Sequence, residues 1–287
     1  MKKSNKVFLV IFSVVIFSFL CVYFLAMKGT VETDDIVDND TGNETETIEV
    51  DGAISEEDIK NIEEYDEYSL YSSSFKGLIK FESGLIDLPF VQSLDNDFYL
   101  RRDFITNDYS ELGSIFMDYE CDFDSKNIIL YGHYVYSTYE AYDDDGNKLD
   151  NSKLMFTPLS LLVDEDNYED NKYVSLVLED EVRTYEVVSV FYCNLVGEGD
   201  DVYPEEYLEY YLSEYDDDYF KEYKNKIKSV EFYDTGVDFS NDDNLLTLQT
   251  CVEGNEYARE IVLCKEISTR KLDRDAYLEY QNGLSDN

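Results

Sequence analysis

The sequence predicts a mainly β protein. Short apolar stretches recur from Phe75 to Ile267, and turn residues such as Ser-Gly or acidic clusters separate them. The chain has 287 residues, of which 44% are hydrophobic and 15% aromatic, enough to build a packed core. Many short strands joined by turns are typical of a barrel or a sandwich.

The predicted strands follow one another along the chain. The stretch FKGLIKFESGLIDLPFVQS, which begins at Phe75, contains two strands around a Ser-Gly turn. The residues LEDE mark a hairpin between YVSLVL and VRTYEVVSVFYC. The remaining predicted strands lie in ELGSIFMDY, KNIILYGHYVY, KLMFTPLSLL, NLLTLQTC and REIVLCKEI.

Two regions predict helices. Residues 54–74 contain Ser55 and, three residues later, Asp58, which is the spacing of a capping box, so one or two short helices are expected there. Residues 204–229 begin with proline and acidic residues and end with lysines, as suits a helix and its dipole. The tyrosines of this insertion either pack the helix onto the barrel or form a ligand-binding face.

The N-terminal part predicts a membrane anchor. Residues 7–26 carry no charge and are numerous enough to span a bilayer as a helix. Lysines in residues 1–6 precede them, which predicts a cytoplasmic tail, a transmembrane signal anchor and a single-pass cell-membrane protein with its bulk outside. A cleaved signal peptide is the alternative. Residues 27–53 read as an acidic extracytoplasmic tether, and 271–287 as a C-terminal tail.

Charge and composition exclude several functions. The chain has 65 acidic and 23 basic residues, a formal net charge of −42, so nucleic acid is not an expected partner. Its single histidine and the lack of a CxxC motif argue against a zinc site, and no metal or cofactor is predicted. A disulfide among Cys121, Cys193 and Cys264 is left open by the sequence.

Three residues form a candidate catalytic set. Cys251 ends one apolar strand, and His133, which could activate a thiol, follows another. If NLLTLQTC and REIVLCKEI pair as a hairpin, Arg259 returns alongside Cys251 and could stabilise an oxyanion. Each also has a structural interpretation: an inert thiol, a satisfied histidine, and a surface arginine between Glu256 and Glu260.

These residues carry a resemblance to a known family. TLQTC, with an arginine at the head of the next strand and an upstream YGH, resembles the sortases, whose pattern is commonly TLxTC. GLIKFESGLIDLPFVQSLDNDFYLRRDF, GSIFMDY and YDTGVDFSNDDNLLTLQTC are similar to class B sortases. The resemblance runs from about Phe75 to Ile267. It implies a closed eight-stranded sortase-like β-barrel at 75–270, with N-terminal helices and a helical insertion before the Cys251 strand.

The resemblance implies a membrane-anchored cysteine transpeptidase. Cys251 would attack the Thr carbonyl of an Asn-Pro-x-Thr sorting signal at the C-terminus of a secreted protein and form a thioester. His133 would protonate the leaving amine and then deprotonate the incoming one. Arg259 would orient the substrate and stabilise the tetrahedral intermediate. The acceptor would be an amine of a cell-wall peptide on a peptidoglycan precursor.

The resemblance also implies a substrate groove lined by Asn96, Leu100, Gln249 and Thr250. The chain departs from the family at Gln249, where class B sequences usually have Ser, and at Val252, where a polar or acidic residue is common. The exact motif therefore stays open. Two alternatives also stay open: a pilin-linking sortase, and a non-catalytic acidic surface-binding barrel in which Cys251 is structural.

Overall fold

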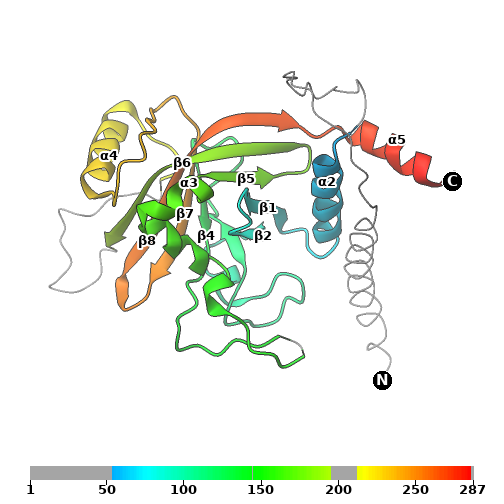
Figure 1. Ribbon diagram of the computed structural model, residues 1–287, viewed down its shortest axis with the longest axis horizontal. Helices are drawn as coiled ribbons and strands as arrows, with labels where there is room; N and C mark the ends of the chain where they lie inside the picture. The colour runs from blue at the N-terminus through cyan, green and yellow to red at the C-terminus, as the bar shows by residue number, and fades with distance from the viewer. Residues whose placement is uncertain (1–53, 144, 195–211, 286–287) are drawn as a thin grey trace, which may run out of the picture. The chain divides into compact units, whose positions relative to one another are not determined.

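The computed structural model describes residues 54–143, 145–194 and 212–285. Within these residues, the strands form a closed barrel in the order β1-β2-β3-β4-β7-β8-β6-β5 (Figure 1). The β2–β3 and β4–β7 pairs are parallel and the other neighbours are antiparallel. The predicted mainly β, closed eight-stranded barrel is confirmed.

The elements have the following bounds. The strands are β1 (Phe75–Phe81), β2 (Asp87–Gln92), β3 (Ile115–Met117), β4 (Asn127–Tyr131), β5 (Tyr173–Val177), β6 (Glu181–Asn194), β7 (Leu245–Val252) and β8 (Asn255–Lys271). The α-helices are α2 (Glu56–Ser69), α3 (Tyr168–Asn171), α4 (Asp217–Val230) and α5 (Arg274–Ser285). The 3-10 helices are η1 (Phe98–Arg101), η2 (Asn151–Lys153), η3 (Thr157–Val163) and η4 (Glu165–Asn167).

Strands β4, β7 and β8 bring distant parts of the sequence together. Strands β4 and β7 run parallel, with Tyr131 beside Gln249. Because parallel strands end at the same edge, the residues after β4 lie next to the end of β7. Strand β8 returns antiparallel to β7 and pairs Cys251 with Arg259.

The interior of the barrel is apolar and is closed at one side by a 3-10 helix. Phe156, Leu159 and Leu162 of the η3 region are fully buried in the same cluster as the strand residues. The prediction of a strand in KLMFTPLSLL is therefore wrong, because this stretch runs from the last residue of η2 through a turn into η3. Pro158 lacks the N–H that a ladder needs, and the apolar residues recur at a helical spacing of three.

The N-terminal helix forms as its cap predicts. Ser55 is the N-cap of α2, and its Oγ accepts a hydrogen bond from the Asp58 amide at 3.0 Å. Ile62 of α2 is fully buried in a cluster that also contains Tyr277 of α5. Arg274 at the start of α5 forms an ion pair with Asp66 of α2 at 2.9 Å. The predicted C-terminal tail is thus largely helical.

The helical insertion packs against the outside of the barrel. Helix α4 begins after the N-cap Asp216, and its buried residues Phe220, Tyr223 and Ile227 join a cluster with residues of β6, β7 and β8. Its described aromatic residues therefore support the packing interpretation. Of the predicted helix 204–229, residues 212–216 are not helical, and residues 204–211 lie outside the described residues.

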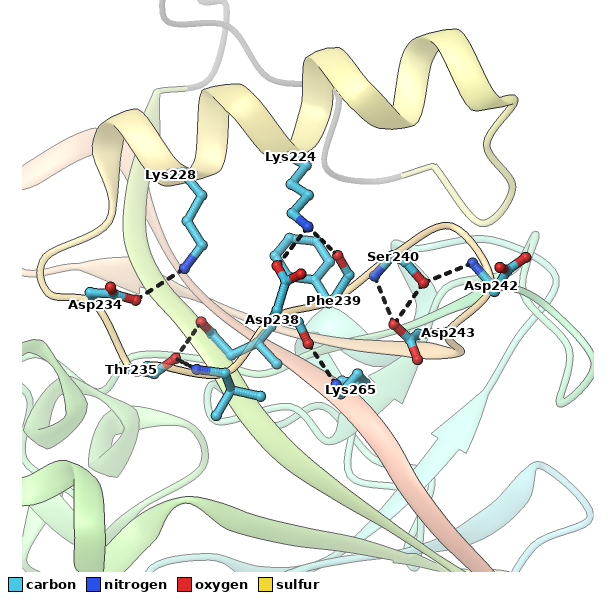
Figure 2. A network of polar contacts seen from close by, with 12 residues as sticks. Lys224, Lys228, Asp234, Thr235, Asp238, Phe239, Ser240, Asp242, Asp243 and Lys265 are labelled. Atoms are coloured by element: carbon cyan, nitrogen blue, oxygen red, sulfur yellow. Dashed lines mark hydrogen bonds and ion pairs between the residues drawn. The ribbon is translucent and has the colours of Figure 1, made fainter.

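Polar contacts fix the segment between α4 and β7 (Figure 2). Lys224 of α4 forms an ion pair with Asp238 at 2.6 Å and donates to the carbonyl oxygen of Phe239 at 2.6 Å. Lys265 of β8 donates to the main-chain carbonyl of Asp238 at 2.6 Å. Helix, segment and barrel are therefore joined at one point, ahead of the strand that carries Cys251.

The predicted single-pass membrane localisation is contradicted by the structure. Across 54–143, 145–194 and 212–285, no helix has the length and apolar character that crossing a membrane requires. Residues 7–26, on which the prediction of an anchor rested, lie outside the described residues, as do 1–6 and 27–53. The membrane as a partner is likewise not supported.

Candidate active site

A pocket lies at the edge where β4 and β7 end. Its volume is about 220 Å³. It contains all seven of the site residues expected from the sequence, together with three others. Its lining residues are Asn96, Leu100, Phe116, Tyr131, Gly132, His133, Gln249, Thr250, Cys251 and Arg259.

The β7–β8 hairpin places Cys251 opposite Arg259. The two residues pair in the antiparallel register, and an irregularity follows at once, because Val252 pairs with Asn255. The turn is made possible by Gly254, whose φ of +82° lies in the left-handed region. Cys251 is partly exposed, so its thiol can be reached from the pocket.

His133 reaches the same pocket from the end of β4. Its Nε2 lies 2.7 Å from the carbonyl oxygen of Leu100, and since a carbonyl only accepts, Nε2 carries the proton. Burial lowers the pKa of His133, the bond to Leu100 opposes this, and the charge of Arg101 lowers the pKa further. The ring is therefore neutral near pH 7, and Nδ1 can accept a proton.

Gly132 allows the chain to turn from β4 to His133. A Cβ at this position would come within 2.5 Å of the Ile115 side chain and 2.6 Å of the Phe156 ring. Any side chain would therefore displace the packing of β3 and η3. The Gly132 amide donates to the Gln249 carbonyl at 3.1 Å, which ties the start of the His133 loop to β7.

Asn96 lines the pocket, but its amide is already engaged. Its Nδ2 donates to the Asp118 carboxylate at 2.8 Å, and its Oδ1 accepts from the Tyr119 amide at 3.1 Å. The hydroxyl of Tyr131 donates to the same carboxylate at 2.7 Å. Asn96 thus helps to build the pocket wall around the buried Asp118, which the sequence did not single out.

Buried polar atoms without hydrogen-bond partners gather beside Cys251. They are Gln249 Oε1, Thr250 Oγ1 and Glu260 Oε1, among the residues that the structure describes. Thr250 and Glu260 are directly opposite each other, and both face the barrel interior by the alternation of the strands. Burial raises the pKa of Glu260 to about 8, so its carboxyl is protonated at neutral pH.

Glu253, in the turn of the β7–β8 hairpin, connects that hairpin to the loop that carries His133. Its Oε1 accepts from the amide of Ser137 at 2.9 Å and from its hydroxyl at 2.6 Å, and its Oε2 accepts from the Tyr134 hydroxyl at 3.4 Å. Hydrogen bonds from Ser137 lower the pKa of Glu253, so it is ionised at neutral pH. No sequence pattern assigned a role to Glu253, although it lies two residues after the cysteine.

The other described cysteines lie in different surroundings. Cys121 and Cys264 are free and buried, so no disulfide forms among Cys121, Cys193 and Cys264. Burial raises the pKa of Cys121 to about 12 and also raises that of Cys264. Among the described thiols, Cys251 alone is partly exposed.

The barrel and its pocket define a class of protein. A closed eight-stranded barrel with cysteine, histidine and arginine at neighbouring strand ends is the arrangement that the TLQTC and YGH motifs indicated for a sortase. No protein-family model matches the chain.

The chain is similar in sequence to Sortase B of Listeria monocytogenes, with 30% identity over 182 residues. The matched part spans 61% of this chain and 61% of that relative. The X-ray structure of Clostridium perfringens sortase B matches with a TM-score of 0.56 and 28% identity, covering 71% of this chain and 99% of the other. Sortase B of Staphylococcus aureus, at 22% identity and a TM-score of 0.55, shares the fold. The predicted resemblance to class B sortases is confirmed.

Proposed function

We propose that the chain is a sortase-type cysteine transpeptidase that joins secreted proteins to a cell-wall amine. The observation that carries this proposal is the single pocket into which Cys251, His133 and Arg259 all open. Nucleophile, proton carrier and cation are the groups that acyl transfer requires. The similarity to class B sortases supports the same reaction.

In the first step, Cys251 Sγ attacks the carbonyl carbon of a Thr residue in the sorting signal. The neutral ring of His133 takes the thiol proton and gives it to the nitrogen of the leaving amine. The C–N bond breaks, and a thioester remains on Cys251. Arg259, opposite Cys251 in the register, stabilises the negative charge on the carbonyl oxygen.

In the second step, an amine attacks the thioester. The C–S bond breaks, a new amide bond forms, and His133 accepts a proton from the amine before the thiol is restored. The acceptor that we propose is a peptide amine of a peptidoglycan precursor. The signal is of the Asn-Pro-x-Thr type, bound along Asn96, Leu100, Gln249 and Thr250.

The side-chain oxygen of Gln249 lacks a hydrogen-bond partner among the described residues, which favours a sorting signal with an N–H or O–H group that donates to it. Gln249 Oε1 is buried and has no partner among the described residues, and a bound peptide N–H would supply one. This position differs from the Ser usual in class B sequences. We therefore propose that the motif preference of this chain is read at Gln249.

The test uses the full chain with a panel of Asn-Pro-x-Thr peptides and an amine acceptor, with products read by mass spectrometry. We expect cleavage after Thr, an acceptor-linked product and a trapped thioester, all lost in Cys251→Ala. Cys264→Ala, which removes a buried thiol outside the pocket, is the matched control and should keep turnover. Thermal melting checks that both variants fold.

Labelling with a mild thiol reagent separates the remaining outcomes. We expect Cys251 to react while Cys121 and Cys264 do not, because burial raises the pKa of both. A folded chain with no turnover and no labelling of Cys251 supports the non-catalytic binding barrel instead. Labelling without turnover points to a different signal. The pilin-linking alternative predicts transfer to an amine of another protein subunit rather than to a peptide.

A further inference from the structure

A second cavity meets the first at the catalytic pair. Its volume is about 290 Å³. It shares only His133 and Cys251 with the pocket described above. The residues that set its chemistry are Arg101, Glu111, Tyr134, Tyr136 and Tyr139.

The two cavities differ in chemistry. The first cavity contains Arg259, which can stabilise a developing oxyanion, and the Gln249 side-chain oxygen, which has no hydrogen-bond partner among the described residues and can accept from a peptide N–H. The second brings together three tyrosine side chains and the carboxylate of Glu111. Carboxylates and tyrosine rings are the groups that bind an ammonium ion.

Glu111 and Tyr139 form a pair at the wall of the second cavity. Burial raises the pKa of Tyr139, and so do the charge of Glu111 and a hydrogen bond between the two side chains. Arg101 also lines the cavity, and its Nη1 donates to the main-chain oxygen of Glu111 at 2.5 Å. The carboxylate of Glu111 is exposed, so a ligand can approach it from solvent.

We propose that this second cavity binds the acceptor substrate, a peptide that carries a primary ammonium group, with Glu111 as its recognition residue. This inference rests on the proposed function, and it adds where the second substrate enters. The thioester carbonyl would be held between the two cavities, because Cys251 belongs to both. The amine then approaches from the side opposite to the acyl chain.

The chemistry balances at this site. The ammonium ion first releases one proton to His133, and the neutral amine that remains attacks the thioester carbon and forms the amide as the C–S bond breaks. The second proton from nitrogen goes to solvent, and the proton on His133 returns to Cys251 Sγ. Burial and Arg101 both lower the pKa of His133, which keeps it neutral and able to accept that first proton.

The main experiment measures how the thioester divides between water and amine. The full chain is incubated with an Asn-Pro-x-Thr peptide and increasing triglycine, and transferred and hydrolysed products are separated by mass spectrometry. Glu111→Gln should raise the triglycine concentration at half-maximal transfer about fivefold, the effect of one exposed ion pair, with recovery at high triglycine. Glu140→Gln, an exposed carboxylate paired with Lys148, is the matched control. An equal half-maximal concentration in both variants overturns the inference.

A binding measurement keeps the two proposals separate. Triglycine and N-acetyl-triglycine, which lacks the ammonium group, are titrated into the Cys251→Ala chain and followed by NMR. We expect triglycine alone to bind and Glu111→Gln to weaken that binding. Equal binding of the two peptides contradicts the amine site even if transfer occurs. If triglycine binds and N-acetyl-triglycine does not, but the wild-type chain forms no thioester, the proposed reaction is wrong and the amine site is still supported.

Discussion

The two ends of the β7–β8 hairpin serve different purposes. At the end near Leu245, residues of both strands are buried under α4, and Lys265 donates to the carbonyl oxygen of Asp238 (Figure 2). At the other end, Cys251 and Arg259 are partly exposed, and Gln249, Thr250 and Glu260 each hold a buried oxygen without a partner among the described residues. The first end is held by contacts within the chain, whereas at the second end the Gln249 oxygen lies at the pocket, where a bound ligand could supply its hydrogen-bond partner.

The largest effect should follow from a change at the unsatisfied end. Arg259→Ala should lower kcat/KM by on the order of 10² to 10³, the usual loss when a group that stabilises an oxyanion is removed. Lys265→Met, at the satisfied end of the same strand, is the control and should change kcat/KM by less than about twofold, as is usual away from the site. Steady-state kinetics with a Thr-containing peptide measures both. Equal losses in the two variants mean that the ends do not differ as we infer.

The buried carboxyl of Glu260 should make stability depend on pH. Its pKa is about 8 in the folded chain, against 4.5 as the usual value, so between these values the folded state keeps a proton that the unfolded state has lost. The free energy of unfolding therefore falls as pH rises from about 4.5 to 8. Glu260→Gln should remove this slope and be more stable at pH 8 by on the order of 4 kcal/mol, because each unit of pKa difference corresponds to about 1.4 kcal/mol.

Urea denaturation at pH 4.5, 6 and 8 measures the effect of Glu260. The control is Glu266→Gln, a less buried carboxylate on the same strand that accepts from Asn244 at 3.2 Å. Glu260 lies opposite Thr250 and Tyr192 in the two strand pairs, and its charge raises the pKa of Tyr192, Tyr134 and Tyr233, after burial as the larger cause. If both variants show the same slope as the wild-type chain, Glu260 is not the group that titrates.

A smaller effect is expected from Glu253, which joins the Cys251 hairpin to the His133 loop. Glu253→Gln keeps the shape but weakens the hydrogen bonds from Ser137 and Tyr134, so kcat should fall about fivefold, as for the loss of one charged hydrogen bond. Tyr134→Phe, which removes the longest of these bonds at 3.4 Å, should have a lesser effect.

The activity that depends on Glu253 should also depend on pH. Hydrogen bonds from Ser137 lower the pKa of Glu253. The ionised carboxylate therefore accepts these hydrogen bonds fully above the usual pKa of a glutamate, and it loses them as the pH falls through the lowered pKa of the folded chain. The wild-type chain should therefore lose turnover at acidic pH, and Glu253→Gln should show less of this loss. Identical pH profiles for the two proteins would exclude the connection.

The smallest effect is expected at the polar network around α4. Lys224→Met removes the ion pair with Asp238, whose side chain is 82% exposed, so the loss in the free energy of unfolding should stay below about 1 kcal/mol. Asp238→Asn keeps the bond from Lys224 to the Phe239 carbonyl and should cost less still. Turnover should not change in either variant. A large loss of turnover means that α4 supports the site more directly than the contacts indicate.

Much of the fold, and the return of Arg259 beside Cys251, could be predicted from local patterns. The cap at Ser55 and the turns at Ser83-Gly84 and Glu253-Gly254 act over a few residues, so sequence spacing is enough to find them. The stretch KLMFTPLSLL was misread because an apolar run fits a strand or a buried 3-10 helix equally well. Pro158 was the signal that could have decided between them.

By itself, the sequence determined most of the strands along the chain, the TLQTC and YGH motifs, and the return of Arg259 beside Cys251 through a short hairpin. Only the tertiary structure decided that His133, over a hundred residues earlier, reaches the same pocket, because that depends on the parallel pairing of β4 with β7. It also decided that Asn96 is held by Asp118, that Glu260 is buried, and that a second cavity meets Cys251. The spacing of residues along the sequence is enough to predict contacts between near neighbours. Pairing between distant strands, and the burial that follows from it, exist only once the barrel closes.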